Sequence, residues 1–186
     1  MIPEQFKNID PFILNELLND FRTITTTHKL PKHHLLHQED TICNHLYFIE
    51  TGIARSYYHK DGKDITAHFA VENGGITAID SFIQRKKSRY NIEILEDAVV
   101  HSMAHYDIQV LLDQKPSYEK FVRLFLEQIY VDLAERVEDL LFYNAKERYD
   151  NLILKKPSLS QRVNLGHIAS YIGVTQETLS RIRAQK

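Results

Sequence analysis

One stretch near the C-terminal end of this chain decides the fold, because residues 167–183 read HIASYIGVTQETLSRIR. In this stretch Ala169 comes four residues before Gly173, and Leu179 comes six residues after it. A small alanine lets two helices cross closely, and glycine adopts the left-handed backbone conformation that a tight turn between helices requires. The spacing therefore predicts two short helices joined by a turn at Gly173.

The second of these helices is expected to have a buried side and an exposed side. The apolar positions that would form a small core are Ile172, Val174, Leu179 and Ile182. Thr175 is suited to cap the second helix. On the exposed side, Arg pairs with guanine, Gln with adenine and Glu with cytosine. The stretch from about residue 165 to residue 186 is thus predicted to be a DNA-binding helix-turn-helix; the alternative is an ordinary helical hairpin that closes the core. The expected DNA contacts are Thr175, Gln176, Glu177, Thr178, Ser180, Arg181 and Arg183.

The charge distribution favours a polyanionic partner at this end. The whole chain has a net charge of −2, yet residues 155–186 carry six basic residues against one acidic residue. These residues are Lys155, Lys156, Arg162, Arg181, Arg183 and Lys186 against Glu177. A basic patch on an acidic body is typical of nucleic-acid binding, although a solvated tail would have the same charge.

The preceding part of the chain has the pattern of a strand-rich domain. An amphipathic helix is expected over residues 11–21, with Asp10 at its start. Short runs rich in β-branched and aromatic residues follow, and the segment 60–63, which reads KDGK, is a strong hairpin signal. The expected strands are 23–27, 46–49, 53–59, 64–71, 90–95 and 98–103. Many short strands separated by turn residues predict an antiparallel barrel or sandwich.

A long helix is expected over about residues 118–144, because apolar residues recur there at steps of three and four. The stripe that we expect to mediate dimerisation is Val122, Leu126, Ile129, Leu133, Val137 and Leu140. A helix of this length outruns a small barrel, which favours self-association. The alternative is that both apolar flanks of the helix contact the same chain.

Residues 167–183 resemble the DNA-binding end of the Crp/Fnr family, the cyclic-AMP receptor protein and its relatives. The order of the expected elements extends this resemblance to the whole chain. It implies an α+β fold: a double-stranded β-helix (jelly-roll) sensor barrel over residues 1–115, a connecting and dimerisation helix over 116–145, and a helix-turn-helix domain over 146–186. It also implies a cytoplasmic transcription regulator that binds double-stranded DNA as a homodimer. RNA polymerase and an unknown small-molecule effector are left open as further partners.

By residue, the resemblance assigns base contact to Gln176, Glu177 and Arg181. Glu177 and Arg181 match the reading residues of the family in type, whereas Gln176 stands where the cyclic-AMP receptor has Arg, so the target sequence need not be the same. The sequence has no residues after the second helix for the β-wing of winged relatives.

The cyclic-nucleotide binders of this family hold their ligand with a Gly-Glu turn and an Arg-Ser or Arg-Thr pair. In this sequence the corresponding effector region is Thr77, Ala78, Ile79, Asp80, Ser81, Ser88, Arg89 and Tyr90. Thr77 and Ala78 replace the Gly-Glu pair, and Ser88 stands at the Arg position. Strand alternation places Ser88, Tyr90, Ile92 and Ile94 inward and Arg89, Asn91 and Glu93 outward. Because a buried phosphate without an inward cation is costly, we expect no useful affinity for cyclic AMP and assign no cofactor.

The histidines raise a competing class, a cupin-like metal-binding enzyme or metal sensor, since the chain has ten of them and His33, His34 and His37 are clustered. Their spacing gives no converging pair on a strand, so we expect neither a metal site nor catalytic residues. Cys43 is the only cysteine, which excludes an intramolecular disulfide and zinc-thiolate or iron–sulfur sites. No signal peptide or membrane-spanning run is expected.

Overall fold

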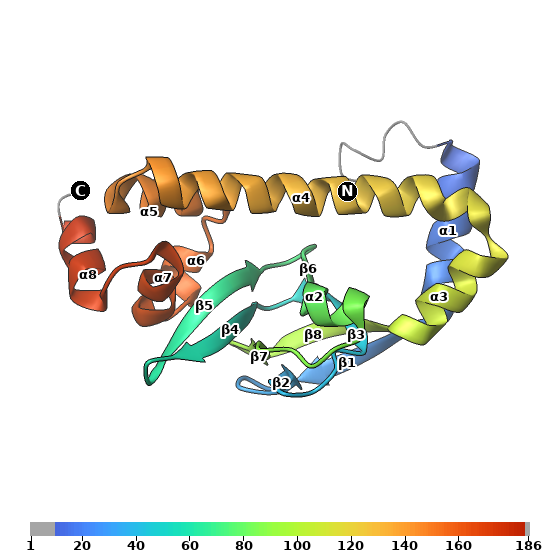
Figure 1. The fold of residues 1–186 in the computed structure, drawn as a ribbon, viewed down its shortest axis with the longest axis horizontal. Coiled ribbons are helices and arrows are strands. Elements are labelled where there is room, and N and C mark those ends of the chain that lie inside the picture. Colours follow the sequence, from blue (N-terminus) through green and yellow to red (C-terminus); the bar gives the residue numbers. More distant parts are fainter. Residues whose placement is uncertain (1–9, 185–186) are drawn as a thin grey trace.

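The computed structural model describes residues 10–184. Two stacked sheets lie beneath one long helix, and a small helical group closes one end of the molecule (Figure 1). Lys186 and the segment 1–9, which the sequence analysis assigned to the basic patch and the sensor domain, lie outside the described residues. The elements in chain order are α1 (Pro11–Thr23), β1 (Thr25–Leu30), β2 (Leu35–His37), β3 (His45–Thr51), β4 (Ala54–Lys60), β5 (Lys63–Ala70), β6 (Gly75–Ile76), α2 (Ile79–Gln84), β7 (Asn91–Ile94), β8 (Ala98–Ala104), α3 (His105–Gln114), η2 (Pro116–Tyr118), α4 (Glu119–Phe142), α5 (Ala145–Lys155), α6 (Leu159–Arg162), α7 (Leu165–Ile172) and α8 (Gln176–Ala184).

The first helix begins where the sequence predicts. The carboxylate of Asp10 accepts the backbone N–H of Phe12 at 2.8 Å, and Pro11 occupies the first helical position. Leu17 is buried against the end of α3 and against Tyr118, whose hydroxyl donates to the Asp20 carboxylate at 2.7 Å. These contacts fix the N-terminal helix against the start of α4.

The strands form two antiparallel four-stranded sheets, in the orders β1-β8-β3-β6 and β2-β7-β4-β5. The six predicted strands correspond to β1, β3, β4, β5, β7 and β8, with bounds that differ by up to three residues. No sequence pattern predicted the short elements β2, β6, α2, α3, η2, α5 and α6. The apolar core between the sheets contains Tyr47, Ile49, Ala54, Ala70, Ile76, Ile92, Ile94, Ala98 and Val100.

The sequence predicts an antiparallel barrel or sandwich and the resemblance implies a jelly-roll barrel, and the strand pairing shows two sheets that do not close on each other. Within residues 10–184 the two sheets share no strand ladder, so the strands form an open sandwich of jelly-roll type. Strand β6 has two residues, pairs with β3 alone and ends its sheet there, while β1 ends the same sheet on its other side.

The long helix α4 has 24 residues and lies along the upper side of the molecule, as predicted in place and length (Figure 1). None of its residues is buried. After it, Asn144 starts α5 with a capping box, in which Asn144 accepts the N–H of Glu147 and the Glu147 carboxylate accepts the N–H of Asn144. This turn lets the chain fold back toward the sheets.

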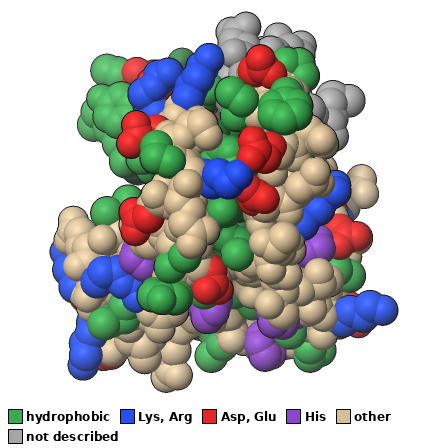
Figure 2. Space-filling view, turned by 90° about the vertical axis from the view of Figure 1, so that its right-hand side faces the viewer, with side chains coloured by type: hydrophobic (Ala, Val, Ile, Leu, Met, Phe, Trp, Pro, Cys, Tyr) green, Lys and Arg blue, Asp and Glu red, His purple; other side chains and the backbone are tan. Residues whose placement is uncertain are grey.

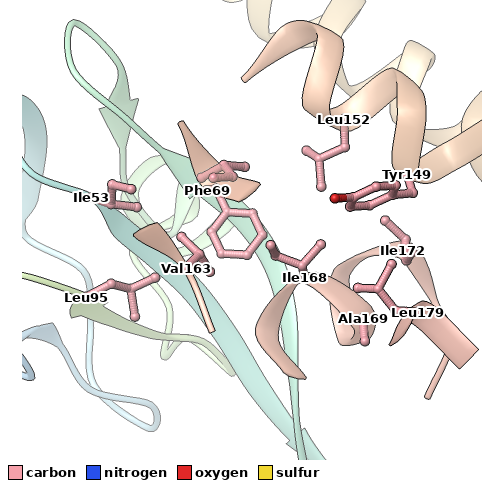
Figure 3. Close-up of a cluster of buried hydrophobic side chains, with 11 residues drawn as sticks. Ile53, Phe69, Leu95, Tyr149, Leu152, Val163, Ile168, Ala169, Ile172 and Leu179 are labelled. Atoms are coloured by element: carbon pink, nitrogen blue, oxygen red, sulfur yellow. The ribbon is translucent and has the colours of Figure 1, made fainter. Parts of the chain in front are cut away.

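A second apolar core joins the sheets to the C-terminal helices. Figure 3 shows Phe69 of the strand side directed toward Val163 and Ile168 of the helical side. The full cluster is Ile53, Phe69, Leu95, Tyr149, Leu152, Leu159, Val163, Ile168, Ala169, Ile172 and Leu179. Because one core contains residues of both parts, the helical group and the sheets are not packed independently.

Polar contacts surround this shared core. The Arg162 guanidinium donates two hydrogen bonds to the Glu72 carboxylate, at 3.1 and 2.6 Å, and a further one to Glu96 at 3.1 Å. On the other side, the Ser170 hydroxyl accepts the backbone N–H of Thr66 at 3.2 Å. These bonds attach α6 and α7 to the strands and their turns.

The ion pair between Arg162 and Glu72 makes the stability of the fold depend on pH. Its hydrogen bonds lower the pKa of Glu72 to about 2, so the pair stabilises the folded chain above the ordinary pKa of a glutamate, about 4.3, and the stabilisation is lost as the pH falls toward about 2. Glu72→Gln should therefore lower the free energy of unfolding at neutral pH, and the difference from the wild type should shrink as the pH falls. Urea unfolding followed by circular dichroism over a pH series measures it.

The matched control is Glu138→Gln, which changes an exposed carboxyl group of α4. We expect no pH-dependent difference from the wild type for this variant. A constant difference for Glu72→Gln from neutral to acid pH would contradict the prediction.

Candidate nucleic-acid interface

The helical pair α7–α8 has the geometry that residues 167–183 predict. Gly173 ends α7 in the left-handed conformation, with φ of 76°, and its N–H donates to the Ser170 carbonyl at 3.2 Å. Ala169 and Leu179 are both almost fully buried where the two helices meet. The predicted roles of the small residue, the glycine and the core leucine are therefore confirmed.

The second helix begins as predicted at Thr175. Its hydroxyl accepts the backbone N–H of Thr178 at 3.3 Å, which satisfies one of the free donors at the start of a helix. At the other end of α7, the Asn164 side chain accepts the N–H of Gly166 at 2.8 Å. A side-chain cap therefore marks the start of each of the two helices.

The outer side of α8 is exposed and polar. Gln176, Glu177, Ser180 and Arg181 surround a shallow open hollow beside Leu165. Thr175 and Arg183 are exposed outside this hollow, and Thr178 is half-buried. The structure therefore brings four of the seven predicted DNA contacts together on one face.

Hydrogen bonds and nearby charges hold the side chains of Arg181 and Glu177 in place. The Arg181 guanidinium donates to the Thr178 hydroxyl at 3.3 Å. The pKa of Glu177 lies below its ordinary value, first because its own backbone N–H bonds the carboxylate, then because of the Thr175 hydroxyl. Arg181 and Lys63 add positive charge nearby. Lys63 belongs to the β4–β5 hairpin and was missed by the sequence analysis, since no local pattern connects it with α8.

The basic patch counted in the sequence is only in part available to a partner. Lys155 forms an ion pair with Glu135 at 2.7 Å. Lys156 donates to the Phe69 carbonyl, and Arg162 is bound by glutamates of the strand turns. Counting charges along the chain therefore overestimates the cations free for DNA, because their partners are far away in sequence.

The predicted effector region is tightly packed. The Ser81 hydroxyl accepts the N–H of Cys43 at 2.9 Å and donates to the Lys86 carbonyl. The Ser88 hydroxyl accepts the N–H of Tyr90 at 2.9 Å, and Ala78 is buried. Thr77 donates to the His45 carbonyl at 2.9 Å. The small polar groups of this region are thus bonded within the chain.

Burial in this region can be compared with the predicted alternation. Ser88, Ile92 and Ile94 are buried and Arg89 is exposed, as predicted. Asn91, which the alternation places outward, is buried, and its side-chain oxygen accepts the N–H of Glu39 at 3.0 Å. A loop therefore covers this face of the strand, which alternation alone does not reveal.

The remaining members of the region are half-buried: Ile79, Asp80 and Tyr90, whose ring lies 5.9 Å from that of Tyr58. One Asp80 oxygen and the His37 Nε2 atom are buried without a hydrogen-bond partner among the described residues. Burial lowers the pKa of His37, and the nearby Asp80 carboxylate partly opposes this effect. Arg85, the basic residue that follows Asp80 most closely in the sequence, donates to the Cys43 carbonyl at 2.8 Å.

The histidines are dispersed. Figure 2, which views the end of the molecule opposite α8, shows histidine side chains in separate patches over its lower half. Within residues 10–184 no three His, Cys, Asp or Glu side chains gather closely enough to hold a metal ion. None of the helices described is long and apolar enough to span a membrane.

The outer side of α4 is an exposed apolar surface. Leu126, Leu133, Val137 and Leu140 of the predicted stripe have 42–60% of their surface exposed, and Val122 and Ile129 are half-buried. Tyr130, Leu141 and Phe142 on the same helix are 70–75% exposed. Helix α4 therefore presents to solvent the kind of side chains that bury themselves against a partner helix.

Comparisons with known proteins agree with this architecture. Residues 27–115 match the family model of the cyclic nucleotide-binding domain. No curated protein sequence matches the chain. Among solved structures, FixK2 from Bradyrhizobium japonicum is 19% identical with a TM-score of 0.73, and the match covers 87% of this chain and 84% of that chain.

Two further structures are similar over nearly the whole chain. A protein from Eubacterium rectale described as a transcriptional regulator of the Crp/Fnr family is 16% identical with a TM-score of 0.71, covering 96% of this chain and 87% of that chain. A CooA mutant from Carboxydothermus hydrogenoformans is 17% identical with a TM-score of 0.67, covering 94% and 82%. At these identities the similarity establishes a shared fold.

Proposed function

We propose that this chain, which has a cyclic nucleotide-binding-type domain and the fold of the Crp/Fnr regulators, is a sequence-specific DNA-binding transcription regulator without enzymatic activity. The observation that carries the proposal is the exposed polar face of α8, held on a Gly173 turn of helix-turn-helix geometry. A hairpin that merely closed a core would not need Gln176, Glu177, Ser180 and Arg181 gathered on its outer face.

The proposal places α8 in the major groove as the recognition helix. Residues at the start of such a helix contact base edges, which assigns base reading to Gln176, Glu177 and Arg181. Ser180, Thr175, Thr178 and Arg183 would bind base edges or phosphates at the rim of the groove. The bond from Arg181 to the Thr178 hydroxyl holds the guanidinium on the helix face before DNA binds.

Two copies of the chain are proposed to pair through α4. The exposed part of the stripe consists of Leu126, Leu133, Val137 and Leu140, and burying these side chains in a dimer removes their apolar surface from water. A two-fold pair of recognition helices would then bind half-sites about one helical turn apart, roughly 34 Å, in an approximately palindromic sequence.

The sensor part is proposed not to respond to cyclic AMP. Arg89 is exposed, Ser88 is buried at the aligned position, and Arg85 is bonded to the Cys43 carbonyl. A cyclic phosphate in the sandwich would lack an inward cation, and an unpaired buried charge is costly.

The central test selects bound duplexes from a randomised library with the full chain, and then compares the wild type with Arg181→Ala on a selected duplex and on random DNA. The proposal expects an enriched, approximately palindromic motif. Arg181→Ala should weaken binding to the selected duplex by about 1–3 kcal/mol per base contact, with a smaller effect on random DNA. Fluorescence anisotropy at fixed salt measures both affinities.

Arg22→Ala is the matched control, since it removes an exposed arginine of α1 far from α8, and it should leave both affinities unchanged. If no motif is enriched, the proposed function fails. If Arg181→Ala weakens both duplexes equally, Arg181 contacts phosphate rather than a base.

The dimer is tested by introducing charge into the α4 stripe. Leu133→Glu combined with Val137→Glu should yield monomers, because four carboxylates would face one another across the two-fold axis without cations. Sedimentation velocity measures the oligomeric state. Glu138→Lys, a charge change at an exposed position beside the stripe, is the control and should remain dimeric. A dimeric double variant would move the interface away from α4.

The proposed lack of a cyclic-AMP response is tested by calorimetric titration of the wild type, with DNA binding measured in parallel. We expect no heat that corresponds to a micromolar or tighter Kd, and no change in affinity for the selected duplex. Binding of that duplex by the same sample shows that the protein is folded. Micromolar binding of cyclic AMP would refute this part of the proposal.

A further inference from the structure

The tip of the β4–β5 hairpin carries two exposed lysines. The strands pair from Ala54 with Ala70 to Lys60 with Lys63, so these two lysines face each other at the last pair. Asp61 and Gly62 form the turn with φ of 51° and 72°, the left-handed values of the tightest hairpin turn. This turn fixes both lysines at the far end of a rigid hairpin.

The hairpin lies along the helical pair. Helix α7 is attached to β5 where the Ser170 hydroxyl accepts the Thr66 N–H at 3.2 Å. Lys63 precedes Thr66 by three residues, so it lies about 10 Å further along the strand. Figure 1 shows the hairpin projecting beyond the sheets at the end of the molecule where α8 lies. Lys63 is also near enough to Glu177, at the start of α8, to lower the pKa of its carboxyl group.

The lysines at the tip are electrostatically available. The adjacent Asp64 carboxylate is held by the Arg55 guanidinium at 2.9 Å, a cation that it shares with Glu93, and not by either lysine. Within residues 10–184 neither Lys60 nor Lys63 has an acidic partner within 4.0 Å. Within residues 60–63, two lysines against Asp61 give the turn a net charge of +1 beside the recognition helix.

We propose that Lys60 and Lys63 bind the phosphate backbone of the DNA duplex, on the side of each recognition helix that faces away from the two-fold axis. This inference rests on the proposed function. In Figure 1 the long helix α4, whose outer side would meet the partner, and the hairpin tip lie on opposite sides of α8. A duplex that crosses both recognition helices therefore continues past each of them toward a hairpin tip.

Phosphate rather than a base is the group that this tip suits. A lysine is a compact point charge on a flexible stem, which binds phosphate oxygens without the fixed geometry that reading a base requires. The hairpin belongs to the sensor sheet, so the sensor domain itself would contribute affinity for DNA. Any movement of the helical pair along β5 would then change the distance between base-reading and phosphate-binding groups.

The test is the double variant Lys60→Gln with Lys63→Gln in the full chain. Affinity is measured over a salt series for a selected duplex extended by about ten base pairs at each end, and for random DNA of equal length. We expect weaker binding to both, and a slope of log affinity against log salt that is smaller by about 3–4 for a dimer, since each lost phosphate contact removes about 0.9.

The matched control is Lys86→Gln with Lys87→Gln, two exposed lysines in the loop after α2 that give the same change in net charge. It should retain the wild-type slope. A hairpin variant that also retains this slope overturns the inference, while a wild type that selects no DNA motif overturns the proposed function instead. A second readout uses a duplex trimmed to the half-sites, on which the hairpin variant should bind like the wild type. An equal loss on the trimmed duplex would overturn direct contact, because the lysines would then act through the position of α8.

Discussion

The shared core between the strand sandwich and the C-terminal helices is the interaction on which the rest of the structure depends. The Phe69 ring lies 5.3 Å from the Tyr171 ring, and Phe69 packs in one buried cluster with Ile168 and Leu179. Two helices of eight and nine residues cannot bury an apolar face against each other alone, so they use the outer surface of the sheet. This packing sets the direction of α8 relative to both the hairpin and α4.

A charged layer lies next to that core, under α7. The Arg55 side chain is 3% exposed and forms ion pairs with Glu93 at 2.6 Å and Asp64 at 2.9 Å. Removing such a group from water is costly, and the cost is offset here because Arg55 also donates to the Thr66 hydroxyl at 3.0 Å. Thr66 in turn bonds Ser170. The network therefore connects the central strands of one sheet with the first helix of the proposed DNA-binding motif, and a rearrangement of these strands would act directly on α7.

The sequence predicted what depends on local pattern and missed what depends on distant partners. Gly173, Thr175 and the alternation around Ile92 act within a few residues, so the helical pair and most strands could be predicted. Helix α3 follows β8 without a side-chain cap or a break, so no start signal marks it. The ion pairs of Arg162 with Glu72 and Glu96, and the position of Lys63 beside Glu177, join residues that only the packed fold brings together.

The exposed position of Arg89 follows from strand register as well as from residue choice. Ile94 of β7 pairs with Ala54 and Ile92 pairs with Ser56, and both isoleucines are fully buried in the sandwich. Turning Arg89 inward by a one-residue slip of this segment would bring both isoleucines to the opposite face. The slip would remove both isoleucines from the core of the sandwich, and Glu93 would lose its bond to Arg55 and enter that apolar core. The strand register that places Glu93 beneath the helical pair therefore also keeps Arg89 outside the sandwich. Arg89 is the arginine nearest in sequence to the position where the family's phosphate-binding arginine is expected.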